Sequence, residues 1–175
     1  MKARLKAIKL LLLDVDGVMT DGKITYTDSG EEIKSFCSKD GFGIRLLMDA
    51  GINVGIITGR AANGALTSRC INLGIHLVLH GIKNKAAALN EILASQQIDL
   101  SEVAFAGDDI PDIPAMQLCG VSFAVANASP EVIKQADYTT SNRGGDGAVR
   151  EICEAILKAK DLWKDILNQF TSTVN

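Results

Sequence analysis

The chain begins with an apolar run that shows no polar alternation. Residues Leu10 to Leu13 are four leucines in succession, a pattern typical of a strand buried on both faces of a parallel sheet. Further apolar runs predict strands over residues 52–58, 75–79, 103–106 and 121–126. Segments with apolar residues at helical spacing lie between these runs, and they predict helices over residues 42–50, 61–73, 85–95 and 148–158.

This alternation of strands and helices predicts an α/β fold, a doubly wound, Rossmann-like parallel sheet with helices on both faces. Residues 23–36 differ, because two short alternating segments flank a glycine-containing turn, which predicts a projecting β-hairpin. An isolated hairpin is only marginally stable in water, so we expect it to pack against another part of the structure, such as another subunit. We expect one domain over residues 1–160, without a cap domain. A tail over residues 161–175 would then contact the core or a neighbouring subunit.

Composition narrows the class of protein. Of the 175 residues, 47% are hydrophobic and 22% are charged, and no apolar run approaches the roughly 18 residues that a membrane span requires. The first nine residues are basic, but the acidic pair Asp14 and Asp16 and the lack of a cleavage site argue against a signal peptide. A net charge of -3 without a basic cluster argues against nucleic acid. Four scattered cysteines predict no disulfide or zinc site, so we expect a cytoplasmic protein.

Polar side chains follow four of the predicted strands where those strands end. They are Asp14 and Asp16, then Thr58, then Lys85, and finally Asp108, Asp109 and Asp112. The carboxyl ends of parallel strands meet at one edge of a sheet, so we expect these groups to share one site. Several carboxylates at one edge are costly unless a cation neutralises them, and oxygen ligands without a His/Cys cluster favour Mg²⁺.

Four motifs, in this order, resemble those of the haloacid dehalogenase superfamily of phosphatases. They are DVDGVMTDG at residues 14–22, ITGR at 57–60, the downstream Lys85, and GDDIPD at 107–112. Each motif lies at the end of a predicted strand. The resemblance therefore covers the whole predicted sheet.

That resemblance implies a role for each residue at the strand ends. Asp14 would be the nucleophile and form an aspartyl-phosphate, and Asp16 would protonate the leaving alkoxide and then activate water. Thr58 and Lys85 would hold the phosphoryl oxygens. The Mg²⁺ ligands would be Asp14, the Asp16 carbonyl and Asp108, with Asp109 or Asp112 in support.

Within the superfamily, the chain resembles a capless, homotetrameric branch that hydrolyses a phosphorylated eight-carbon keto sugar acid for lipopolysaccharide synthesis. The segments DGKITYTDSGEEIKSF, SKDGFGIRLL, RCINLGI and GGDGAVREIC carry this resemblance, over about residues 10–157. It implies that a neighbouring subunit covers the active site. An arginine should bind the substrate carboxylate, because a guanidinium pairs with a carboxylate in two places. The implied substrate-binding residues are Cys37, Ser38, Lys39, Asp40, Gly41, Arg45, Gly59, Arg60, Arg69 and Lys85.

Three alternative functions fit the sequence less well than this one. Arg60 favours the eight-carbon substrate, because similar phosphatases for a nine-carbon keto acid 9-phosphate have Glu at that place. A receiver-type signalling module would carry its acceptor Asp after the third strand, where this chain has Leu79, His80 and Gly81. A non-catalytic phosphate binder would be suggested by the loss of Asp14 or Asp16, and both are present.

Several candidate residues also have a purely structural interpretation. His76 and His80 flank a predicted strand without an evident partner, which favours a structural or solvent role. The loop from Gly144 to Gly147 opens a helix and could hold phosphate or simply allow close packing. Arg45 lies one turn into a helix and could be a surface cation.

Overall fold

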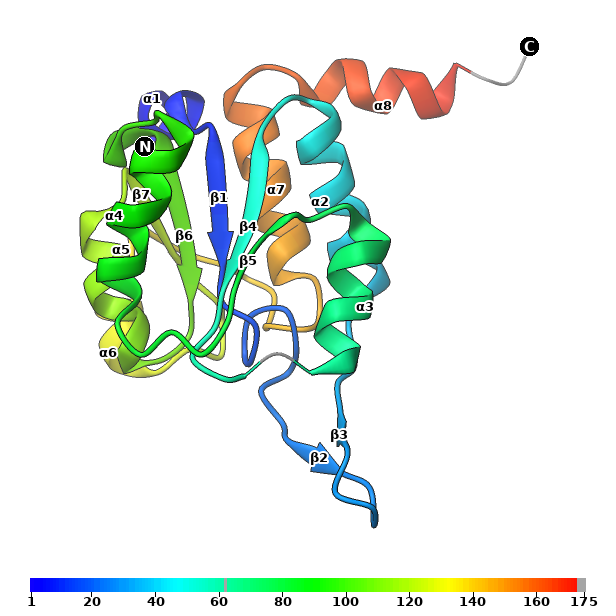
Figure 1. Cartoon of the computed structure of the whole chain (residues 1–175). Coiled ribbons are helices and arrows are strands. Elements are labelled where there is room, and N and C mark those ends of the chain that lie inside the picture. The colour runs from blue at the N-terminus through cyan, green and yellow to red at the C-terminus, as the bar shows by residue number, and fades with distance from the viewer. Residues whose placement is uncertain (62, 173–175) are drawn as a thin grey trace.

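The computed structural model in Figure 1 describes residues 1–61 and 63–172, without the side chains of residues 95 and 96. Its central sheet has six strands in the order β5-β4-β1-β6-β7-β8, and every pairing is parallel. From β1 the chain moves outward on one side to β5 and then crosses to the other side at β6, which confirms the doubly wound fold. The strands are β1 (Leu10–Leu13), β4 (Asn53–Ile57), β5 (Leu77–Leu79), β6 (Val103–Gly107), β7 (Val121–Ala124) and β8 (Tyr138–Thr139).

Strand β1 lies at the middle of the sheet. Leu10 to Leu13 pair with residues 53–56 of β4 on one side and with residues 103–106 of β6 on the other. All four leucine side chains are at most 1% exposed. Helices cover both faces of this strand, so neither face requires polar residues, and the sequence shows no alternation.

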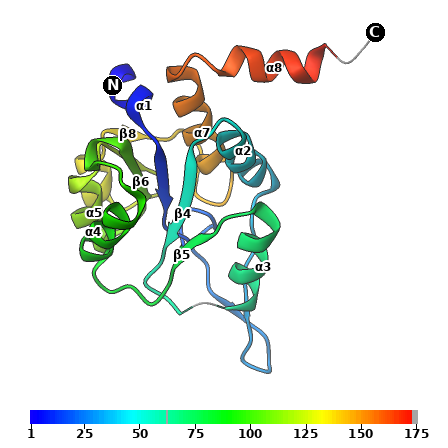
Figure 2. The same cartoon turned by 45° about the horizontal axis from the view of Figure 1, so that its top comes forward.

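Two layers of helices enclose the sheet (Figures 1 and 2). One face carries α2 (Ser38–Asp49), α3 (Gly64–Leu73) and α7 (Ala148–Ala159), and the other carries α4 (Lys85–Gln96), α5 (Ile113–Leu118) and α6 (Pro130–Gln135). The 3-10 turns η1 (Leu100–Glu102) and η2 (Ile110–Asp112) lie on either side of β6 in sequence. Within residues 1–61 and 63–172, no helix has the length and apolar character needed to cross a membrane.

The starts of two helices differ from the sequence prediction by three or more residues, and one helix was not predicted. Helix α2 begins at Ser38 rather than at residue 42, because its first turn is polar and lacks apolar spacing. Helix α1 (Lys2–Ala7) was not predicted, and it buries Leu5 while its basic residues face solvent. Helix α3 begins at Gly64, later than the predicted residue 61, and residue 62 lies outside the described residues.

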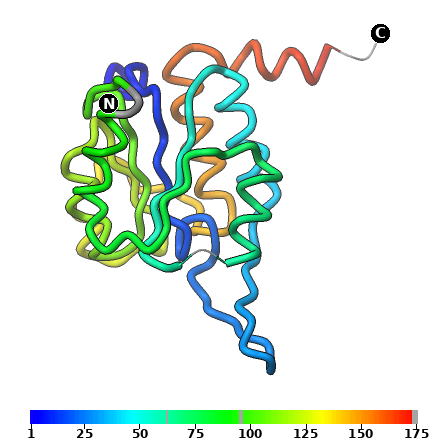
Figure 3. The backbone as a smooth tube through the Cα atoms, viewed as in Figure 1, coloured from blue at the N-terminus to red at the C-terminus, as the bar shows by residue number. Residues whose placement is uncertain are grey.

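The predicted hairpin is present and extends beyond the carboxyl edge of the sheet, as the tube in Figure 3 shows. It consists of β2 (Thr25–Tyr26) and β3 (Glu32–Ile33), which pair antiparallel. Tyr26 is 59% exposed and Ile33 is 48% exposed. Exposed apolar side chains on a short hairpin are consistent with a covering partner.

The tail contains helix α8 (Trp163–Thr171), which extends away from the body at the end opposite the hairpin. None of its described residues is buried. Phe170 makes an edge-to-face contact with Phe42 of α2, with 5.6 Å between ring centroids. The last part of the predicted tail, residues 173–175, lies outside the described residues.

The glycine-rich loop packs against the turn that follows β1. The Gly145 amide donates to the Val18 carbonyl at 3.0 Å, and the Gly144 amide donates to Asn127 Oδ1 at 2.8 Å. A Cβ atom on Gly144 would lie 1.6 Å from the Gly17 carbonyl oxygen, which is a backbone atom. Of the two interpretations of this loop, phosphate binding and close packing, these contacts favour close packing.

We predict that Gly144→Ala destabilises the fold by about 2–4 kcal/mol, since two backbone segments must separate to admit the methyl group. The measurement is the urea midpoint at fixed protein concentration. Gly64→Ala is the matched control, because a Cβ there meets no atom within 4 Å and Gly64 is the first residue of α3. The control should unfold at or slightly above the wild-type midpoint. Equal midpoints for both variants would contradict the packing argument.

Candidate active site

A pocket of about 480 Å³ lies at the carboxyl edge of the sheet, where the loops after β1, β4, β5 and β6 meet. All seven polar residues that we expected to share one site at the strand ends line it. The topology explains this, because β1 lies between β4 and β6 and the chain crosses the sheet there. The lining residues are Asp14, Asp16, Gly22, Thr58, Gly59, Arg60, Ile82, Lys83, Lys85, Asp108, Asp109, Pro111 and Asp112.

Lys85 joins two buried carboxylates at the base of the pocket. Its Nζ atom lies 2.7 Å from Asp14 Oδ1 and 2.5 Å from Asp112 Oδ1, and all three residues are buried. Burial lowers the pKa of Lys85, but the two carboxylates outweigh it and raise that pKa above its ordinary value. The ammonium group therefore stays charged and holds both acids in place.

Asp112 also orients the loop after β6. Its Oδ2 atom accepts hydrogen bonds from the backbone amides of Asp108 at 3.0 Å and Asp109 at 3.3 Å. One side chain thus fixes both the lysine and the loop that carries two further acids. Pro111 is the second residue of the short 3-10 turn η2 (Ile110–Asp112), where its fixed backbone angle suits the turn that places Asp112 for this role.

Carboxylates are crowded at one point of the pocket. Oxygen atoms from Asp14, Asp108 and Asp112 lie within 4.8 Å of one another. Burial raises the pKa of Asp14 to about 6 and that of Asp108 to about 7, and repulsion between neighbouring acids adds to both shifts. Such a cluster of oxygens fits a hard divalent cation, which would relieve the repulsion. A Cβ on Gly17 (φ +92) would lie 2.0 Å from Asp108 Oδ2, so glycine is required beside this cluster.

Asp16 lies outside the cluster and contacts cations from two other segments. Lys34, from the hairpin, forms an ion pair with Asp16, and Arg60 Nε lies 3.7 Å from Asp16 Oδ2. Lys34 also pairs with Glu32 at 2.8 Å, and its side chain is only 5% exposed. The two carboxylates raise the pKa of Lys34 despite its burial.

Lys34 and Glu32 belong to the site but were not predicted from the sequence. The alternating pattern of residues 32–36 carried the signal, because it places these two side chains on one face of the hairpin. The contacts of Lys34 with Asp16 and of Glu32 with Arg60 depend on where the base of the hairpin meets the sheet edge, which the pattern could not show.

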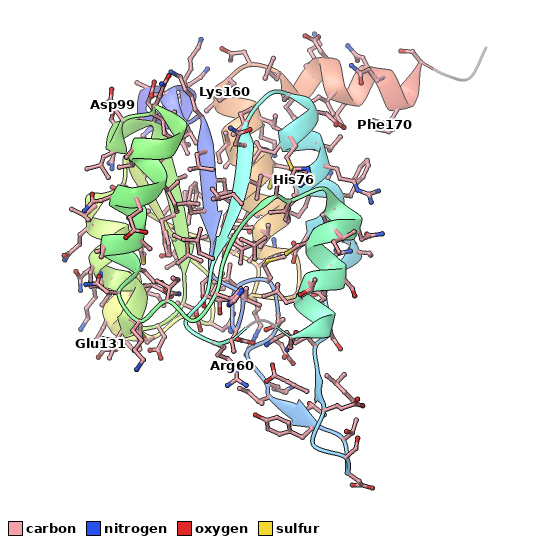
Figure 4. All side chains as sticks on the ribbon, viewed as in Figure 1. Arg60, His76, Asp99, Glu131, Lys160 and Phe170 are labelled. Atoms are coloured by element: carbon pink, nitrogen blue, oxygen red, sulfur yellow. The ribbon has the colours of Figure 1, made fainter. Side chains whose placement is uncertain are left out.

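Thr58 and Arg60 occupy the loop after β4. Thr58 is buried, and its Oγ1 atom accepts a hydrogen bond from the Arg60 amide at 3.3 Å. The Arg60 guanidinium forms an ion pair with Glu32 and donates to the Tyr26 hydroxyl at 3.3 Å. Figure 4 shows Arg60 where the base of the hairpin meets the sheet edge. Arg60 thus connects the pocket to the hairpin.

Seven of the predicted substrate-binding residues do not line this pocket within the single chain. They are Cys37, Ser38, Lys39, Asp40, Gly41, Arg45 and Arg69. Cys37 and Ser38 instead line a separate hollow of about 350 Å³ beside Gly145.

The side chains of three of these seven residues form hydrogen bonds with backbone atoms of this chain. Asp40 is buried and accepts hydrogen bonds from the Gly147 amide at 3.4 Å and the Arg150 amide at 2.8 Å, so it caps the start of α7. Arg45 donates to the Asn72 carbonyl at 2.6 Å. Arg69 donates to the Cys37 carbonyl at 3.0 Å.

The two histidines do not take part in the acidic pocket. His76 and His80 line two separate hollows near the outer strand β5, and Figure 4 shows His76 away from the sheet edge that carries Arg60. This placement agrees with the structural or solvent role expected from the sequence.

Similarity to known proteins identifies the family to which this chain belongs. A sequence profile of haloacid dehalogenase-like hydrolases matches residues 72–152. A curated relative is 46% identical over 158 residues, which cover 90% of this chain and 84% of the relative. The chain therefore belongs to the haloacid dehalogenase-like hydrolases. The relative is the 3-deoxy-D-manno-octulosonate 8-phosphate phosphatase KdsC of Escherichia coli strain K12.

Solved structures agree with this relationship. The crystal structure of the 3-deoxy-D-manno-octulosonate 8-phosphate phosphatase from Yersinia pestis has a TM-score of 0.91 and 45% identity, covering 93% of this chain and 88% of that chain. The enzyme of the same name from Moraxella catarrhalis has a TM-score of 0.94 and 38% identity, covering 97% of each chain. That structure is a complex with a magnesium ion, a phosphate ion and a KDO molecule.

The raised pKa values predict how cation binding depends on pH. The pKa values of Asp14 (about 6) and Asp108 (about 7) lie above the ordinary value of 3.8. Without a cation, both acids therefore bind more protons in the folded state than in the unfolded state. The two acids contribute fully to folding stability below the pKa of the unfolded state, and this contribution is lost as the pH rises through the folded-state pKa values of about 6 and about 7. A divalent cation binds the deprotonated acids. Added Mg²⁺ should therefore raise the melting temperature by about 5–10 °C at pH 8 and far less at pH 5.5.

Two variants make this measurement specific. Asp108→Asn should lose most of the Mg²⁺-dependent shift, whereas Asp49→Asn, at an exposed position of α2, should keep it. A shift of equal size at both pH values, or one that survives in Asp108→Asn, would disprove cation binding at this cluster.

Proposed function

We propose that this protein hydrolyses 3-deoxy-D-manno-octulosonate 8-phosphate to the free sugar acid and phosphate, as a Mg²⁺-dependent step of lipopolysaccharide precursor synthesis in the cytoplasm. The observation that carries the proposal is the buried Asp14 at the end of β1, paired with Lys85 and adjacent to Asp108. The names of the relatives give the substrate, and the sequence identity extends over most of the chain.

In the proposed mechanism, a carboxylate oxygen of Asp14 attacks the phosphorus atom. The bond between phosphorus and the sugar oxygen breaks, the leaving alkoxide takes a proton from Asp16, and an aspartyl-phosphate remains on Asp14. Asp16 then accepts a proton from water, which attacks the phosphorus atom and releases phosphate. With a pKa of about 6, Asp14 is mostly ionised at neutral pH, as a nucleophile must be.

Other residues stabilise the negative charge on the phosphoryl group during its transfer. Lys85 and Thr58 would donate to phosphoryl oxygens, on which a loose transition state spreads its charge. Asp14, Asp108 and the Asp16 carbonyl would hold Mg²⁺, which supplies further charge neutralisation when bound. Asp112 keeps Lys85 in position throughout, supported by its bonds to the amides of residues 108 and 109.

The nine-carbon keto acid 9-phosphate is the alternative substrate. Arg60 favours the eight-carbon acid, and its guanidinium is held at the rim of the pocket by Glu32 and Tyr26. A rim cation fixed in this way suits a substrate whose second anionic group lies near the pocket mouth.

We also propose a homotetramer in which each active site is completed by a neighbouring chain. The pocket is open, no cap domain is present in the described residues, and the hairpin beside it exposes Tyr26 and Ile33. Of the predicted residues outside the pocket, the ones that are not buried would then face the site of a neighbouring subunit: Cys37, Ser38, Lys39, Arg45 and Arg69. The tail over residues 161–175 is a further candidate for a subunit contact, because Leu167 and Phe170 of α8 are 44% and 58% exposed.

Asp14→Asn should abolish phosphate release from the octulosonate 8-phosphate, lowering kcat by at least about 10³-fold, because an amide cannot act as the nucleophile. The assay measures inorganic phosphate with Mg²⁺, using the eight-carbon 8-phosphate, the nine-carbon 9-phosphate and common sugar phosphates. Glu91→Gln, at an exposed position of α4, should retain full activity. Comparable slow turnover of all substrates would remove the substrate assignment, and no release by the wild type would remove the enzyme assignment.

Subunit sharing predicts that specific activity falls when the protein is diluted to monomers. Mixing Asp14→Asn with Arg69→Ala, two impaired variants, should restore part of the activity, since a site in a mixed tetramer can combine an intact Asp14 with an intact neighbouring Arg69. Light scattering on the same samples gives the assembly state. Full turnover by a monomeric sample, or no recovery in mixed tetramers, would rule out shared sites.

A further inference from the structure

Glu151, in the first turn of α7, binds the segment that leads into the glycine-rich loop (residues 144–147). Its carboxylate accepts hydrogen bonds from the Tyr138 hydroxyl at 3.0 Å, the Ser141 amide at 2.9 Å and the Asn142 amide at 3.0 Å. The Asn142 side-chain amide donates to Glu151 Oε2 at 2.7 Å, the shortest of these bonds. Burial raises the pKa of Glu151, but these hydrogen bonds outweigh it and hold that pKa below its ordinary value. The carboxylate is therefore charged at neutral pH and fixes the start of the loop.

The glycine-rich loop lies directly on the turn after β1. Gly144 and Gly145 contact backbone atoms of residues 17–20, with no room for a side chain between them. That turn is itself compact, because the Val15 carbonyl accepts hydrogen bonds from three of its amides at 2.9 to 3.3 Å. A shift of the loop would therefore displace the turn as a unit, and the backbone of Asp16 with it.

Asp16 depends on this backbone for the position of one of its oxygens. Lys34 binds Asp16 Oδ1, whereas Asp16 Oδ2 is buried and has no hydrogen-bond partner among the described residues. Arg60 Nε lies 3.7 Å from Oδ2, which is too far for a hydrogen bond. Asp16 Oδ2 is therefore available to hold the proton that the proposed mechanism gives to the leaving alkoxide, and its place follows that of the turn.

We propose that Glu151 is a positioning residue, which acts through the glycine-rich loop to hold Asp16 where it can protonate the leaving group. The proposal rests on the proposed function and adds to it a residue of α7 that lies outside the pocket. Glutamine has nearly the same shape as glutamate, but its NH₂ group would face the donors of the loop. Glu151→Gln should therefore loosen the loop and weaken proton transfer, while the nucleophile stays in place.

The test compares two substrates whose leaving groups differ in their need for a proton. The octulosonate 8-phosphate releases an alkoxide, whereas 4-nitrophenyl phosphate releases a stable phenolate that leaves without a proton. At saturating Mg²⁺, Glu151→Gln should lower kcat/KM for the 8-phosphate about tenfold, and for 4-nitrophenyl phosphate by less than about twofold. Asn142→Ala removes the shortest bond to Glu151 and should shift the ratio of the two kcat/KM values in the same direction.

Tyr138→Phe is the matched control, because it removes one hydrogen bond from the same carboxylate and leaves the donors of Ser141 and Asn142 in place. It should keep the wild-type kcat/KM for both substrates. Urea midpoints for all variants test whether unfolding contributes to any loss. If Glu151→Gln does not fold, the ratio for Asn142→Ala decides the question.

Three results would overturn the proposal while the proposed function stands. They are equal losses on both substrates in Glu151→Gln, no loss in that variant, and a loss in Tyr138→Phe that is equally selective for the 8-phosphate. Each would leave Glu151 a residue that serves the fold alone. A wild type inactive on the 8-phosphate would remove the proposed function and, with it, the role of Glu151.

Discussion

The structure depends on how one sheet edge accommodates buried negative charge. Asp14, Asp108 and Asp112 come from two adjacent strand ends, and their oxygen atoms lie within 4.8 Å of one another. Removing carboxylates from water is costly unless opposite charge compensates them. Lys85 supplies part of that compensation inside the chain, and its bonds to Asp14 and Asp112 tie the loops after β1, β5 and β6 together. The remaining negative charge is what makes the site a receptor for a cation and, with it, for phosphate.

A second layer of charge lies above this buried centre. Asp16, Glu32, Lys34 and Arg60 form an alternating set that links the sheet edge to the hairpin. The hairpin is therefore connected to the active site within the chain itself. Through Lys34 it contacts the acid beside the nucleophile, so its position and the geometry of the site are coupled.

Sequence patterns predicted the fold and the centre of the site for a clear physical reason. Strands buried on both faces leave continuous apolar runs, and parallel strands carry their functional groups at the same edge, so Asp14, Thr58, Lys85 and Asp108 could be placed together. The side-chain partners of Asp40, Arg45 and Arg69 could not be predicted, because they depend on how α2 packs against α3 and α7. Lys34 was missed for a similar reason, since a pattern of period two does not show which way a hairpin bends.

The contact between the glycine loop and the turn after β1 consists of main-chain atoms. Gly144 and Gly145 rest directly on the backbone of residues 17–20, with no side chain between the two segments. The turn that follows Asp14 is therefore positioned by main-chain atoms of the glycine loop. The place of the nucleophile is thus tied to the start of α7, a helix that follows it by more than 130 residues in the chain.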